Sequence, residues 1–154
     1  MRMRFITVAA IVISMLVIAT AAVAQSPFVG TWKLNLDKSN FIVGAPLGWT
    51  DVFREIEGDQ YEVKSEIALP DGSIINEVMV WPRQGGVAAF IQGGAEGVTD
   101  VETVISPNEM FVTRMVDKKQ SGLIKLLVSP NGKIIRYTIK FPGVMEGEAL
   151  FDKQ

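Results

Sequence analysis

The sequence predicts an all-β domain in which an antiparallel meander of about 8–10 strands closes into a lipocalin-like barrel. Two observations predict it. Apolar and polar residues alternate with period two in many short segments, as they do in half-buried strands. Glycine-containing and asparagine-containing turns separate these segments. Closure removes the two unpaired edges that a long meander would otherwise expose. A β-sandwich is the alternative arrangement of the same strands.

The alternation is clearest in three segments, near the start, middle and end of the domain. In each, every second side chain is apolar or small, and charged or polar side chains lie between them. The predicted inward faces are Phe28, Trp32, Leu34 and Leu36; Tyr61, Val63, Ser65, Ile67 and Leu69; and Ile135, Tyr137, Ile139 and Phe141.

Four short turns are predicted to connect strands into hairpins. Gly58-Asp59, Asp71-Gly72, Pro107-Asn108 and Asn131-Gly132 separate apolar segments of similar length. They join the predicted strands 52–57, 61–69 and 74–81, then 98–105 and 110–117, and finally 123–128 and 133–141. Further strands are expected at residues 87–92 and 148–152, which completes the meander.

The N-terminus has the three-part pattern of a secretory signal. Met1-Arg2-Met3-Arg4 is basic, residues 5–23 are mostly apolar, and Ala22-Val23-Ala24 places small residues at a cleavage site. We therefore expect a signal peptide at residues 1–24, cleavage after Ala24, and a barrel domain at 25–154 in the periplasm or outside the cell. A retained transmembrane anchor is the alternative, because the apolar run is long enough to span a bilayer.

Composition excludes several kinds of chemistry. The chain has 154 residues, no cysteine, no histidine and a net charge of −2. Thiol nucleophiles, Ser-His-Asp triads and Cys/His metal sites are therefore impossible. The acidic balance disfavours nucleic acid as a partner. We expect no cofactor or metal, and no stable insertion in a membrane after signal cleavage, because the short strands carry charged faces that lipid would not accept.

The start of the domain resembles the lipocalins. Gly30-Thr31-Trp32 at the first strand is similar to the lipocalin signature, and the stretch PFVGTWKLNLDKSNF (27–41) resembles the start of small secreted bacterial lipocalin-like proteins. Phe151-Asp152-Lys153-Gln154 at the end also fits that group, most of which has no known function. The resemblance implies that Lys153 packs over Trp32 as a cation–π contact that closes the barrel. Gly30 and Trp32 are then structural, since glycine permits close approach and the indole fills the closed end.

Aromatic side chains and one arginine are the candidate ligand contacts. Barrels of this size have room for one small apolar ligand, which aromatic residues in the middle strands could line. Arg114 would point inward if its same-face neighbours Val112 and Val116 do, and a buried guanidinium needs an anion such as a ligand carboxylate. Alternatively, Phe111, Thr113 and Met115 form the inner face and Arg114 is exposed. The aromatic candidates are Trp49, Phe53, Trp81, Phe90 and Phe111.

These features favour an exported protein that binds a small apolar or amphipathic molecule and is not an enzyme. One alternative is an envelope module for structure or interaction, with a core filled by side chains. Another is an enzyme that uses carboxylates, for which the acidic residues of the 52–69 hairpin are candidates, although an exposed hairpin face explains them as well. Those residues are Glu55, Glu57, Glu62 and Glu66. The sequence does not determine the oligomeric state.

Overall fold

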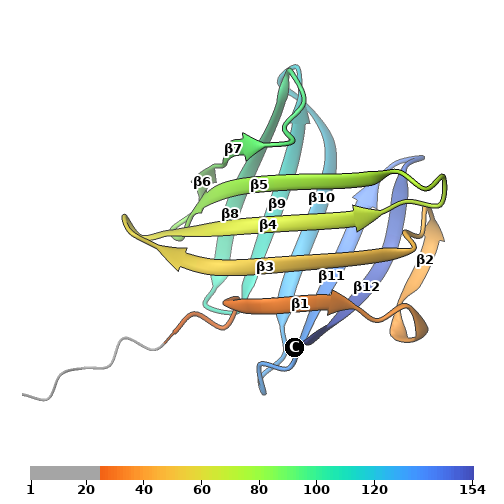
Figure 1. The fold of residues 1–154 in the computed structure, drawn as a ribbon. Coiled ribbons are helices and arrows are strands. Elements are labelled where there is room, and N and C mark those ends of the chain that lie inside the picture. Colours follow the sequence, from red (N-terminus) through yellow and green to blue (C-terminus); the bar gives the residue numbers. More distant parts are fainter. Residues whose placement is uncertain (1–24) are drawn as a thin grey trace, which may run out of the picture.

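The computed structural model describes residues 25–154 as one antiparallel sheet of twelve strands that wraps into a nearly closed barrel. The predicted signal peptide lies outside the described residues. Figure 1 shows β3, β4 and β5 across the front of the barrel and the later strands inclined behind them. The elements are β1 (Gly30–Leu34), the 3-10 turn η1 (Leu36–Lys38), β2 (Asn40–Val43), β3 (Gly48–Ile56), β4 (Gln60–Ala68), β5 (Ile74–Pro82), β6 (Gly86–Val87), β7 (Ala89–Gln92), β8 (Val98–Ser106), β9 (Glu109–Val116), β10 (Lys119–Val128), β11 (Ile134–Phe141) and β12 (Met145–Lys153).

The first strand closes the meander. β1 pairs with β3 on one side and with β12 on the other, so Trp32 lies opposite both Asp51 and Lys153. Consecutive hairpins run from β3 to β5 and from β8 to β12. The first and last strands therefore meet in one sheet. This confirms the predicted barrel and excludes the sandwich.

One irregular segment completes the wall between β5 and β8. Residues 87–92, predicted as a single strand, are divided at Ala88. β6 pairs with β8, whereas β7 pairs with β5. The backbone N–H of Ala88 donates to the carbonyl of Asp100 at 2.9 Å. We call this junction between β5 and β8 the seam.

The core fills one end of the barrel. Trp32, Phe28 and Phe53 are completely buried there, beside Phe151 and Ile135. The three predicted inward faces are all present: in β4 and β11 buried residues alternate with more exposed ones as expected. On the first segment only Leu36 departs from the pattern, because it lies in η1 and is exposed.

Candidate functional site

A cavity of about 170 Å³ lies inside the other half of the barrel. Its walls are mostly apolar and include Val63 and Met79 from the front strands and Leu126 from the back. It reaches the surface beside Ile75 and Val144, which are both exposed. Apolar protein cavities of about 150 Å³ accept a ligand the size of benzene. The space therefore suits a single ring or a short alkyl group.

Two of the aromatic candidates line this cavity. Trp49 and Trp81 face it from β3 and β5. Phe53 does not, because its ring is packed in the filled end, 5.4 Å from the Trp81 centroid and 6.1 Å from that of Phe28. Phe90 lies on β7 outside the lining, and Phe111 lies beneath Lys125. The expectation that Phe53, Phe90 and Phe111 line the pocket is therefore wrong.

Asp51 forms the polar wall of the cavity. It alternates with Trp49 and Phe53 on the inner face of β3 and is fully enclosed. Its Oδ1 accepts hydrogen bonds from Trp49 Nε1 at 2.8 Å and Ser65 Oγ at 2.6 Å, and its Oδ2 accepts one from the Tyr137 hydroxyl at 2.6 Å. Burial raises the pKa of Asp51 despite these three donors. The same burial, with the Asp51 carboxylate beside it, raises the pKa of Tyr137.

Arg114 points into the barrel. Met110 and Val112 are buried on the same face of β9, so the alternative in which Phe111, Thr113 and Met115 form the inner face is wrong. The anion that this guanidinium needs is supplied by the protein. Arg114 Nε and Nη2 each donate to Asp100 at 2.8 Å, and Nη2 also lies 3.3 Å from Glu77 Oε2. Hydrogen bonding to Asp100 raises the pKa of Arg114 above its already high ordinary value.

This ion cluster crosses the seam. Asp100 and Arg114 face each other on neighbouring strands β8 and β9, whereas Glu77 lies on β5 at the far side of the seam. Phe90 from β7 and Phe141 from β11 cover the guanidinium, with ring centroids 5.8 Å and 5.9 Å from its central carbon. Arg114 therefore ties together strands that do not share a continuous backbone ladder.

Two interior polar groups have no hydrogen-bond partner among the described residues. They are the indole N–H of Trp81 and both carboxyl oxygens of Glu102. Glu102 lies two residues beyond Asp100 on the inner face of β8 and is 3% exposed. Burial, reinforced by the charge of Asp100, raises its pKa to about 8. Glu102 is therefore largely uncharged at neutral pH. It does not belong to the cavity lining.

No protein-family model and no curated protein matches the sequence. Among solved structures, the fluorescent protein UnaG has a TM-score of 0.58 and 16% sequence identity over 83% of this chain and 98% of its own. Two mutants of UnaG give TM-scores of 0.56 and 0.55, at 15% and 20% identity, over 83% of this chain and 96% of theirs.

The fold is a calycin-type β-barrel. Its identity with these structures is low, so the likeness establishes the architecture alone. Within the calycin-type barrel, the hollow half carries the candidate site and the filled half carries the residues that the sequence assigned to closure.

The filled end of the calycin-type barrel contains the predicted contact between Lys153 and Trp32. Lys153 Nζ lies 5.1 Å from the centroid of the Trp32 ring. The indole Nε1 donates to the carbonyl of Phe28 at 2.7 Å. A Cβ atom at Gly30 would lie 2.4 Å from Cε of Lys153, and Gly30 has a φ of +143°. Glycine is therefore needed for the lysine to reach the ring.

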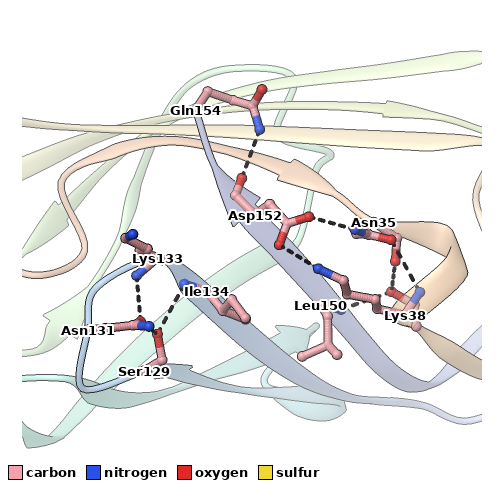
Figure 2. Close-up of polar contacts among 10 residues, drawn as sticks. Asn35, Lys38, Ser129, Asn131, Lys133, Ile134, Leu150, Asp152 and Gln154 are labelled. Atoms are coloured by element: carbon pink, nitrogen blue, oxygen red, sulfur yellow. Dashed lines mark hydrogen bonds and ion pairs between the residues drawn. The ribbon is translucent and has the colours of Figure 1, made fainter.

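Polar contacts on the surface connect the last strand, β12, to the turn that follows β1. Asp152 accepts hydrogen bonds from Asn35 Nδ2 at 2.6 Å and Lys38 Nζ at 3.4 Å, as Figure 2 shows. The bond from Asn35, followed by that from Lys38, lowers the pKa of Asp152. These polar groups satisfy one another, so their arrangement is explained by the structure of the last strand.

The acidic residues of the β3–β4 hairpin do not form a site. Glu55, Glu57 and Glu66 are exposed, and Glu62 Oε1 pairs with Arg54 at 2.8 Å and Lys64 at 3.4 Å. Glu62 and Glu66 lie on the outer face of β4, and Glu57 lies in the turn after β3. Glu55 pairs with Arg83 and accepts a hydrogen bond from the N–H of Ser26. Within residues 25–154 we find neither a cluster of acidic side chains arranged to hold a metal nor a helix able to cross a membrane.

Sequence reasoning missed the interior carboxyl groups. Asp51, Glu77, Asp100 and Glu102 all occupy inward positions of their strands. A signal was available for Asp51, which alternates with Trp49 and Phe53. Asp100 faces Arg114 in the β8–β9 pairing, but that register becomes visible only when the hairpin is built.

Proposed function

We propose that this protein binds a small apolar or amphipathic molecule inside the barrel and acts after export from the cytoplasm. The observation that supports binding is the cavity of about 170 Å³, with apolar walls, a few polar groups and access to the surface. This is the general character of small-molecule sites. Export rests on the signal-like residues 1–24 of the sequence.

The carboxyl groups favour binding over catalysis. An enzyme working through two carboxyls needs both within reach of its substrate. Asp100 is held by Arg114 through both oxygens, and its neighbour Glu102 lies outside the cavity lining. Asp51 is occupied by three donors. We therefore propose no catalytic step.

A titration tests the binding proposal. A hydrophobic fluorescent probe should bind the chain 25–154 saturably and with a one-to-one stoichiometry. Ile124 lines the cavity, so Ile124→Trp should fill it and weaken binding by about tenfold or more. Phe111→Trp changes the outer face of the neighbouring strand and should leave binding unchanged. Failure of the unmodified protein to bind any such probe would favour the alternative of an envelope module with a filled core.

A further inference from the structure

The charged groups of the cavity are predominantly acidic. Its lining contains three carboxyl groups, from Asp51, Glu77 and Asp100, and one guanidinium, from Arg114. A fourth carboxyl, that of Glu102, lies behind the lining on the same face of β8. An apolar ligand with a polar head must place that head in this environment.

Arg114 is already neutralised. Asp100 engages it through two hydrogen bonds of 2.8 Å and is only 2% exposed, and Glu77 adds a second anion at 3.3 Å. Together these three charged groups carry one net negative charge. A ligand carboxylate that approaches the guanidinium would meet two like charges beside it, in a site of low dielectric where repulsion is strong. The sequence-based expectation that Arg114 attracts a carboxylate therefore loses its physical basis.

Glu77 retains capacity to accept hydrogen bonds. Within the described chain its Oε2 accepts one long bond, from Arg114, and its Oε1 accepts none. Its side chain is 13% exposed and lines the cavity. The hydrogen-bond donors to Asp51 are all neutral groups, so within residues 25–154 this carboxyl group is not paired with a cation.

We propose that the ligand carries a cationic or N–H donor head, such as a primary ammonium group, on a small apolar body, and that Glu77 binds this head. This inference rests on the proposed function, because it specifies the ligand class of the same cavity. The apolar walls hold the body, and the size of the space limits that body to about one ring or a short chain. Burial of the ammonium beside Glu77 supplies the pairing that a charge requires inside a protein.

Three ligands of equal length separate the possibilities. Hexylammonium, hexanol and hexanoate should be titrated by calorimetry into the chain 25–154, alongside the fluorescent probe. We expect the amine to bind about tenfold or more tighter than the acid, with the alcohol between them. A cavity that binds the acid best, or all three equally, would overturn the inference and leave the proposed function intact. If neither the probe nor any of the three binds saturably, the proposed function itself is wrong.

Glu77→Gln tests the assigned residue. It keeps the shape of the side chain and removes its charge, so the preference for the amine over the alcohol should disappear while affinity for the alcohol is retained. Glu66→Gln is the matched control, since Glu66 lies exposed on the neighbouring strand and should leave the preference unchanged. Asp100 still pairs with Arg114 in the Glu77 variant, and an unfolding curve checks that the fold is retained. An amine preference that survives in Glu77→Gln would overturn the assignment.

Discussion

At the scale of single residues, burial of the Glu102 carboxyl group lowers the stability of the fold. Its carboxyl group is enclosed, and neither oxygen accepts a hydrogen bond from residues 25–154. A buried polar group without a partner typically costs about 1–3 kcal/mol. Protonation reduces this cost, because a neutral carboxyl is easier to bury than a carboxylate. This explains why its pKa rises to about 8.

Glu102→Gln should stabilise the protein at alkaline pH. The folded state keeps its proton up to about pH 8, whereas the unfolded chain loses it near 4.5. Stability should therefore fall as pH rises between these values. The glutamine cannot titrate, so we expect its free energy of unfolding to exceed that of the unmodified protein by roughly 4 kcal/mol at pH 8 and to match it near pH 4. Chemical denaturation across this range is the measurement, with Glu66→Gln as an exposed control. Asp51 should contribute a residual slope in the same direction, since its pKa is also raised.

Trp32→Ala should be among the most damaging substitutions in the filled end. Its side chain is fully buried, donates to the carbonyl of Phe28 and lies under Lys153. Removing a large buried ring should lower the free energy of unfolding by about 3–5 kcal/mol. Trp32→Phe, which keeps most of the volume, should lose less. A loss below about 1 kcal/mol for the alanine variant, measured by urea denaturation, would mean that Trp32 is not part of the core.

At the scale of elements, the hairpins that the sequence predicted share one property: local residues determine them. Asp71-Gly72 and Asn131-Gly132 provide the positive φ that a tight turn needs, at Gly72 and Gly132. β2 could not be found in this way, because its four residues pair with β12 more than a hundred positions later. The division of residues 87–92 at the seam also depends on two distant partners.

The candidate site was predictable to a similar extent. Trp49 and Trp81 were predicted as ligand contacts because they are aromatic residues of the middle strands, and the structure places both in the cavity lining. Alternation left two orientations of Arg114 open, of which the structure shows the inward one. Alternation does not say which end of a barrel is filled, and for this reason Phe53 was misassigned. It also treats a carboxyl group as an outward residue, whereas Asp51 and Asp100 point inward because each has specific donors there.

The β9–β10 connection offers a test of local turn energetics. Asp117 and Lys118 adopt φ values of +48° and +64°, although neither is glycine. Lys118→Gly should relieve the strain of the left-handed conformation and raise the free energy of unfolding by about 0.5–1 kcal/mol. Lys119→Gly, one residue later at the start of β10, should instead lower it by a comparable amount. The denaturation midpoints of the two variants are the measurement. If both variants were destabilised, the left-handed conformation of Lys118 would not be strained.

At the scale of the whole molecule, the barrel has two unlike halves. One is filled by aromatic side chains that contact each other edge to face, such as Phe53 with Tyr61 at 6.4 Å between centroids. The other contains the cavity and the interior ions. The filled half supplies stability that the chain obtains without any disulfide, since it has no cysteine. The filled half can then support the hollow half, in which interior polar groups and empty space are retained at some cost to the stability of the fold.

The contacts that Ser26 makes with the barrel lead to the last prediction, a mature N-terminus at Gln25. Ser26 is buried, its N–H donates to Glu55 Oε1 at 3.1 Å, and its Oγ accepts from the Tyr61 hydroxyl at 2.5 Å. Within residues 25–154, burial therefore starts at Ser26, two residues after Ala24, while Gln25 itself is exposed. A chain cut after Ala24 would keep every one of these contacts. We therefore expect protein isolated from the cell envelope or medium of its native host to have an intact mass corresponding to residues 25–154. Recovery of a species that retains residues 1–24 in the membrane fraction would instead support the transmembrane anchor.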